Sequence, residues 1–126
     1  MYINKAFIYG NITKDVELKT LPSSGQSVVN FSIATNKTWK DKSGEKQEQS
    51  EFHNIVVYGK TAELISQYCK KGDSIYIEGS IQTRSWDKDG VKMYKTEIIT
   101  ENFQFGTKLN KQSPVVENEN SDNIDF

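Results

Sequence analysis

Only one stretch of this chain has the apolar spacing of a helix, and strand-like segments stand on both sides of it. In KTAELISQYCKKGD, Leu64 lies four residues before Tyr68, which places the two side chains on one helical face. Ile65 has the same relation to Cys69. Gly72 is the expected end of this helix. The rest of the fold must therefore come mainly from strands.

The flanking segments show the period-two alternation of strands. INKAFIYGNIT, SVVNFSIATNKTW and EFHNIVVYG precede the helix, and SIYIEGSIQTRSW and VKMYKTEIITENFQF follow it. VELKT is a short additional extended piece. Three strands, a helix and two strands are the order of an OB-fold, an all-β, five-stranded Greek-key barrel that often binds oligonucleotides. A generic five-stranded α+β sheet is the alternative.

Charge and composition divide the chain into a body and a tail. Residues 1–111 hold all 16 Lys and Arg but 13 of the 17 Asp and Glu, a net charge of +3. Residues 112–126 hold no basic residue and four acidic ones, a net charge of −4. We predict a single domain over 1–106 and a disordered acidic tail over 107–126. A mildly basic body with an acidic tail is compatible with nucleic-acid binding, but an ordinary solvated surface explains the charge equally well.

The chain gives no sign of secretion or of membrane insertion. It has one cysteine, Cys69, so no internal disulfide is possible, and we expect a core role for that side chain. The longest apolar runs, such as AFIY and IVVY, have four residues, and no signal peptide is recognisable. We therefore expect a cytoplasmic protein without membrane contact.

Several aromatic residues fall on polar strand faces. Trp86 shares a face with Arg84, two residues earlier. Phe52 and Tyr58 share a face with Asn54, and this is the less core-like face of its strand. Surface aromatics next to Lys and Arg suit single-stranded nucleic acid, because every base has a face that can stack on a ring. The alternative is that these rings fill a core or an oligomer contact.

Trp39 is harder to place, because no apolar side chain follows it from Lys40 to Glu51. Strict alternation puts Trp39 in phase with the apolar residues Phe31 and Ile33. A bulge or a strong bend would release it from that phase. Because Asn36, Lys37 and Thr38 precede Trp39, we expect the strand to have left the core by then, with a hairpin loop around KSGEK.

Long blocks of the chain resemble the bacterial single-stranded DNA-binding protein family, of the homotetrameric type with one OB-fold per subunit. The resemblance runs from about Asn4 to Phe105. It includes FSIATN.TWKDK.GE..EQ.EFHNIVVYGK.AE and YCKKGDSIYIEGSIQTRSW, in order and at matching separations. Blocks of this length are far more specific than a short motif.

The resemblance implies roles for individual positions. The stacking aromatics of the family correspond to Trp39, Phe52, Tyr58 and Trp86, and the basic positions along the DNA path to Lys60, Lys71 and Arg84. Phe52 stands where a tryptophan is frequent, so its smaller ring should stack more weakly. Asn54 occupies an often-basic position, and His53 matches a histidine of the tetramer interface.

The tail also resembles that family, whose members end in a linker and a short acidic tip. The tip is SDNIDF here, with the partner-binding positions Asp122, Asn123, Ile124, Asp125 and Phe126. Asp125 replaces the usual proline. The tip would offer an apolar anchor and negative charge to a basic pocket on replication and repair proteins. A tail this short suggests a phage, plasmid or accessory version.

An enzyme is the main rival class, and the motifs do not favour it. DKDG looks like a calcium loop, but the position that an EF-hand fills with glutamate is Ile98, so we predict a turn. No P-loop, zinc spacing or G-x-S-x-G is present. Glu51 and His53 are predicted to face apart, which would exclude a catalytic dyad. We expect no catalytic residue, metal or cofactor.

The predicted function is sequence-independent binding and protection of single-stranded DNA during replication, recombination and repair, with the acidic tip recruiting partner proteins. Two further alternatives remain open. One is an OB-fold adaptor that mainly binds proteins, and the other is binding of structured RNA.

Overall fold

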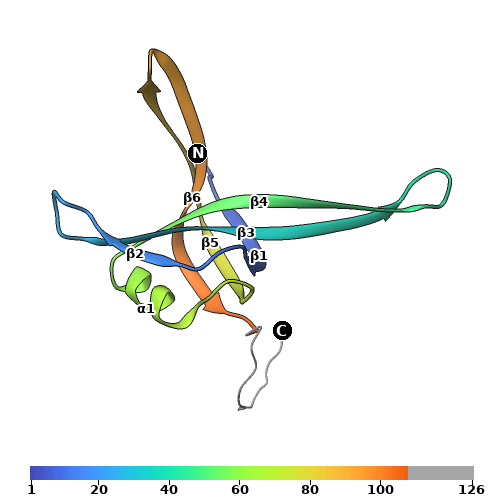
Figure 1. Cartoon of the computed structure of the whole chain (residues 1–126), viewed down its shortest axis with the longest axis horizontal. Helices are drawn as coiled ribbons and strands as arrows, with labels where there is room; N and C mark the ends of the chain where they lie inside the picture. The colour runs from blue at the N-terminus through green and yellow to red at the C-terminus, as the bar shows by residue number, and fades with distance from the viewer. Residues whose placement is uncertain (108–126) are drawn as a thin grey trace.

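The computed structural model describes residues 1–107 and contains one helix and six strands (Figure 1). Their bounds are β1 Ala6–Ile12, β2 Glu17–Thr20, β3 Ser27–Lys40, β4 Lys46–Tyr58, α1 Lys60–Tyr68, β5 Ser74–Lys88 and β6 Val91–Phe105. The predicted disordered tail and the tip residues Asp122, Asn123, Ile124, Asp125 and Phe126 lie outside the described residues, which end at Thr107.

Five strands close into a barrel in the order β1-β5-β6-β4-β3, and a β1–β3 pairing completes the ring. Every neighbouring pair is antiparallel except β4 and β6, which run parallel where Ile55 pairs with Ile98. β2 corresponds to the predicted short extended piece and pairs with the first four residues of β3, Ser27 to Asn30. This confirms the predicted five-stranded barrel, with one helix after the third long strand.

Alternating side chains of the five strands fill the barrel. The buried core consists of Ile12, Val29, Phe31, Ile33, Ile55, Val57, Ala62, Ile65, Cys69, Ile75, Ile77 and Ile98. On β4, Ile55 and Val57 point inward while Phe52 and Tyr58 are exposed, as the alternation predicted. Burying isoleucine and valine on one face stabilises the sheet at about 25 cal/mol per Å² of apolar surface.

Gly79 allows two barrel strands to approach each other closely. A Cβ atom at this position would collide with the backbone carbonyl of Ile99 on β6. The register between β5 and β6 shifts at the same point, between Glu78 and Gly79. A glycine next to a bulge lets a sheet bend sharply, so this position helps the strands to turn around the barrel.

The helix α1 covers one end of the barrel through its buried residues Ala62 and Ile65. It follows Gly59, whose φ of 76° suits glycine. The helix ends at Tyr68 and not near Gly72, so the predicted C-terminal end was wrong by about a turn. Its end is set by Cys69, which takes an extended conformation while its side chain is buried in the core.

Two hairpins project from the barrel as arms (Figure 1). The β3–β4 arm stays paired without a register shift from Val28 opposite Tyr58 to Lys40 opposite Lys46. The ladder therefore contains no bulge before Trp39. The expectation that the strand has left the core by this point is confirmed, since Trp39 is exposed. Trp39 keeps the phase of Phe31 and Ile33, but the strand has by then left the barrel, so that phase no longer leads into a core.

The β5–β6 arm ends in the predicted turn within DKDG. Lys88 pairs with Val91, and the two residues between them, Asp89 and Gly90, have φ values of 52° and 80°. Positive φ at both central positions is the geometry of a type I′ hairpin, which Asp-Gly favours. No helix in the described part of the chain is long and apolar enough to span a membrane.

Candidate nucleic-acid interface

The four predicted stacking residues are all substantially exposed. The exposed fractions are 41% for Trp39, 61% for Phe52, 42% for Tyr58 and 38% for Trp86. Large rings in an ordinary core would be buried, since each contributes a large apolar area. None of the four therefore belongs to the barrel core, and each presents ring surface to the outside.

Three of the four rings lie on one surface of the sheet. Phe52 and Tyr58 alternate onto the outer face of β4, and Trp86 lies on the outer face of β5. The strand β6 runs between them, with Lys95 opposite Arg84 in the ladder. We call this surface, built on β4, β6 and β5, the aromatic face.

Trp39 does not join the aromatic face. It lies opposite Gln47 near the tip of the β3–β4 arm, whereas Phe52 lies opposite Ala34. Odd-numbered and even-numbered residues of β3 point to opposite faces of the ribbon. Trp39 and Phe52 therefore project from opposite faces of the same arm, and any single strand that touched both would have to pass around it.

Each tryptophan has a cation two residues before it on the same strand face. The Arg84 guanidinium lies 5.0 Å from the Trp86 ring centroid, and the Lys37 amine lies 5.7 Å from that of Trp39. Cations at these distances over a ring are attracted to its electron-rich face. Both arms thus carry a ring with positive charge beside it, a combination that suits a base and its phosphate.

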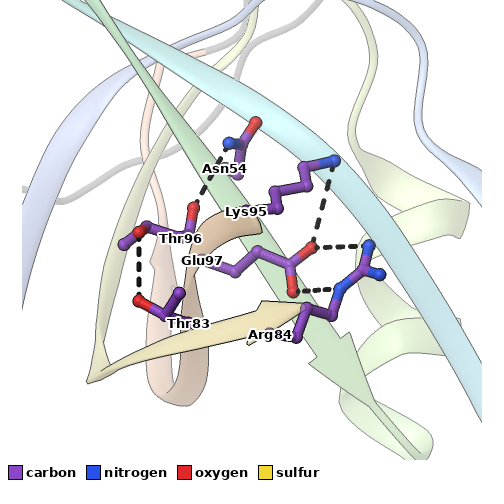
Figure 2. Close-up of polar contacts among 6 residues, drawn as sticks. All are labelled: Asn54, Thr83, Arg84, Lys95, Thr96 and Glu97. Carbon is purple, nitrogen blue, oxygen red and sulfur yellow. Dashed lines mark hydrogen bonds and ion pairs between the residues drawn. The ribbon is translucent and has the colours of Figure 1, made fainter. Parts of the chain in front are cut away.

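Arg84 is itself held by a carboxylate (Figure 2). Its Nε donates to Oε1 of Glu97 at 2.9 Å, and Nη2 donates to Oε2 at 3.4 Å. These hydrogen bonds and the charge of Glu97 raise the pKa of Arg84 above its ordinary value, and Tyr58 adds to the effect. Arg84 is thus held between the Glu97 carboxylate of β6 and the Trp86 ring of β5.

Asn54 has a structural role on this surface (Figure 2). Its Nδ2 donates to the backbone carbonyl of Thr96 on β6 at 3.3 Å. Its Oδ1 accepts a hydrogen bond from the Ser32 hydroxyl on β3 at 3.4 Å. The side-chain amide therefore links three strands.

The predicted basic residues Lys60 and Lys71 are exposed and lie at the two ends of the helical segment. Lys60 begins α1, two residues after Tyr58. Lys71 follows the helix, and its backbone N–H donates to Asp15 at 3.0 Å. Within residues 1–107 neither amine lies over an aromatic ring, so their use depends on the path of the ligand.

Three lysines that the sequence did not single out line a groove beside the aromatic face. Lys14, Lys19 and Lys95 surround a volume of about 420 Å³ together with Asn30 and two carboxylates, Asp15 and Glu17. Lys95 could have been found from the sequence, because counting outward along both strands from the Asp-Gly turn places it opposite Arg84. Lys14 and Lys19 gave no comparable signal.

His53 lies half-buried at the mouth of the barrel, where its Nε2 is 2.9 Å from the hydroxyl oxygen of Thr35. The prediction that Glu51 and His53 face apart was wrong, since residues two apart on a strand share a face. Even so, His53 contacts the Thr35 hydroxyl and not the Glu51 carboxylate.

A groove between the two arms contains an aromatic residue that the sequence analysis missed. Phe52, His53 and Tyr94 line this groove of about 440 Å³. Tyr94 is 66% exposed. The sequence did not show that Tyr94 lies on a polar face, because the residues around it are polar on both faces of the strand. Among residues 1–107, no group of three or more His, Cys, Asp or Glu could hold a metal ion.

Comparisons with known proteins agree with this geometry. Residues 3–106 match the Single-strand binding protein family. The chain is 50% identical over 104 residues to Single-stranded DNA-binding protein 1 of Chlorobaculum tepidum. That alignment covers 81% of this chain and 64% of the relative, so the chain spans less than two thirds of its length.

Two solved structures share the fold. The first is a Plasmodium falciparum SSB in complex with ssDNA, with a TM-score of 0.76 and 33% identity, covering 83% of this chain and 96% of the other. The second is a deletion mutant of the single-stranded DNA binding protein from Thermus aquaticus. Its TM-score is 0.73 and its identity 25%, over 85% of this chain and 52% of the other.

Proposed function

This chain belongs to the single-strand binding protein family, and on that premise we propose that it binds and protects single-stranded DNA without regard to sequence. The observation that carries the proposal is the aromatic face, where Phe52 and Tyr58 of β4 and Trp86 of β5 are exposed on one side of the sheet, with Arg84 beside Trp86. Bases of any kind can stack on such rings, so binding does not depend on the sequence of the strand. Binding of this kind requires no catalysis, so we propose a non-enzymatic role.

Two physical terms would supply the affinity. Stacking of a base on an aromatic ring contributes roughly 1–3 kcal/mol and tolerates any base. Lysines near the path, among them Lys14, Lys60, Lys71 and Lys95, would neutralise phosphates and make binding weaken as salt rises. Trp39, on the other face of the β3–β4 arm, would meet a different part of the strand.

The direct test is tryptophan fluorescence during titration with oligo-dT, at low and at high salt. The chain has two tryptophans, so Trp39→Phe and Trp86→Phe each leave a single reporter. We expect saturable quenching of both reporters by the single strand, and little change with a duplex of equal length. No quenching, or equal quenching by the duplex, would overturn the proposal.

We further propose that the chain assembles as a homotetramer, with His53 at a subunit contact. Support comes from the half-buried position of His53 at the barrel mouth, beside an open groove lined by Phe52 and Tyr94. Sedimentation velocity gives the assembly state, and His53→Ala should shift it toward smaller species. An unchanged tetramer in the variant would remove His53 from the contact.

The acidic tip, Asp122–Phe126, is proposed as a docking segment for replication, recombination and repair proteins. Its support is chemical: Asp122 precedes the apolar residues Ile124 and Phe126, and Asp125 lies between them. Such a segment fits a basic pocket with an apolar floor. The proposed setting for this activity is the cytoplasm, where the chain would coat exposed single strands.

A further inference from the structure

Glu97 is a buried carboxylate in the middle of a surface proposed to bind a polyanion. It is 5% exposed, although it alternates onto the outer face of β6. The side chains of Arg84 and Lys95 accompany it on that face, with the Lys95 amine 4.0 Å from its Oε2 (Figure 2). A buried negative charge beside a phosphate path opposes binding unless it has another role.

The contacts of Glu97 point to that role. Two hydrogen bonds join its carboxylate to the guanidinium of Arg84, at 2.9 and 3.4 Å. A two-point contact fixes the orientation of the guanidinium plane as well as its position. The same guanidinium lies 5.0 Å from the Trp86 ring centroid. Glu97 therefore determines where Arg84 lies relative to Trp86 before any ligand arrives.

The same contacts also determine how much Arg84 contributes to the salt dependence of DNA binding. Binding weakens with salt because each phosphate that a protein cation neutralises releases counterions from the strand, and a guanidinium already balanced by a carboxylate neutralises little phosphate charge. Arg84 would then serve mainly as a flat surface next to Trp86, since guanidinium planes stack on bases as aromatic rings do. Lys95, with only one long contact to Glu97, keeps most of its capacity for phosphate.

We propose that Glu97 is a positioning residue for single-stranded DNA binding: it holds Arg84 beside Trp86 as part of a stacking platform and removes Arg84 from the set of phosphate-neutralising cations. This inference rests on the proposed function. It assigns Arg84 a different task from that of a simple basic contact along the DNA path.

The test is Glu97→Gln, which keeps the shape of the side chain and removes its charge. The matched control is Asp87→Asn, which removes a charge next to Trp86 at an exposed position on the opposite strand face. For Glu97→Gln, we expect the slope of log affinity against log salt to steepen by about 0.7, the value for one added phosphate contact on a single strand. Asp87→Asn should leave the slope unchanged.

A spectroscopic readout on the free protein separates positioning from charge. In the Trp39→Phe background Trp86 is the only tryptophan, and with excitation selective for tryptophan, acrylamide quenching reports how well its ring is covered. We expect Glu97→Gln to increase acrylamide quenching relative to Asp87→Asn, because Arg84 is no longer held in place. Circular dichroism on the same samples verifies that the barrel is folded.

Repeating the experiment in an Arg84→Gln background shows whether Glu97 acts through Arg84. There, Glu97→Gln should no longer steepen the salt slope. Equal steepening in both backgrounds would overturn the inference and would assign the effect to Lys95. An unchanged slope and unchanged quenching in the single variant would also overturn it. If the unmodified chain fails to bind oligo-dT, it is the proposed function that fails.

Discussion

At the scale of single residues, the interface depends on ring size and on the cation next to each ring. Phe52 is as exposed as any ring on the aromatic face, at 61%, but it is the smallest of the aromatic side chains there. Among the residues up to Thr107, no cation lies over the Phe52 ring, whereas Lys37 lies over Trp39 and Arg84 over Trp86. Phe52 should therefore be the weakest of the stacking positions and the one most easily improved.

Replacing Phe52 with tryptophan should strengthen binding of oligo-dT by roughly twofold to fivefold, because a larger ring overlaps more of a base. Fluorescence anisotropy of a labelled oligonucleotide measures the change. The control is Phe7→Trp on β1, a ring with nearly the same exposure, 60%, that lies outside the aromatic face. Equal gains at both positions would indicate nonspecific adhesion of tryptophan.

Asp41 organises the tip of the β3–β4 arm. Its carboxylate accepts hydrogen bonds from the backbone N–H groups of Ser43 and Glu45 and from the side chains of Ser43 and Gln47. The bond from Glu45 contributes most to a pKa below the ordinary value of 3.8. Because the folded pKa is depressed, the stabilisation is present above the ordinary value and is lost as pH falls through the folded pKa.

We expect an NMR titration to give Asp41 a pKa below 3.8, with amide exchange at Ser43 and Glu45 accelerating only when the pH falls through that pKa. Asp41→Ala should show the faster exchange already at neutral pH. A titration at or above the ordinary value would show that the tip is not held in this way.

At the scale of elements, alternation within a strand was predictable and the extent of pairing was not. The exposed faces of β4 and β5 follow from period-two spacing, which depends only on the strand itself. The length of the β3–β4 arm depends on how far the two strands pair with each other. The residues between Lys37 and Gln49 are polar on both faces, so their alternation does not show which face they occupy. For that reason the sequence suggested a bulge where the ladder is continuous.

The contact between β5 and β6 gives an element-level prediction. Gly79→Ala places a methyl group against the Ile99 carbonyl, so one of the strands must shift. We expect a loss of about 1–3 kcal/mol or more in the free energy of unfolding, measured with urea. Ser80→Ala, at the next position of the same strand, should cost well under half of that. Similar losses would argue against a close approach at Gly79.

At the scale of the whole molecule, the proposed binding residues come from different strands and arms, and this limits what a sequence can reveal about the site. The identities of Trp39, Phe52, Tyr58 and Trp86 came from strand faces and from family resemblance. Their division into an aromatic face and a separate Trp39 requires the register of β3 against β4. The pairing of Arg84 with Glu97 likewise requires the register of the β5–β6 hairpin.

Deleting Asp122–Phe126 tests whether the barrel binds DNA on its own while the tip binds partner proteins. We expect unchanged or slightly tighter binding of oligo-dT, because two negative charges are lost. Capture of a purified protein with a basic, apolar-floored pocket should fall at least tenfold. Charge-neutral Asp122→Asn with Asp125→Asn should give part of this loss. Equal capture with and without the tip would remove the docking role.

The pairing that closes the barrel has a consequence for how the protein opens. β1 and β3 meet through only two residue pairs, Asn11 with Ala34 and Ile12 with Ile33. β1 meets β5 through six. Short ladders separate at lower free energy than long ones. The barrel has a second ladder of the same length, where Ile55 and Val56 of β4 pair with Ile98 and Ile99 of β6. Thermal opening should therefore begin at these two seams, with deuterium entering around Ile12–Ile33 and Ile55–Ile98 before it reaches Ile77.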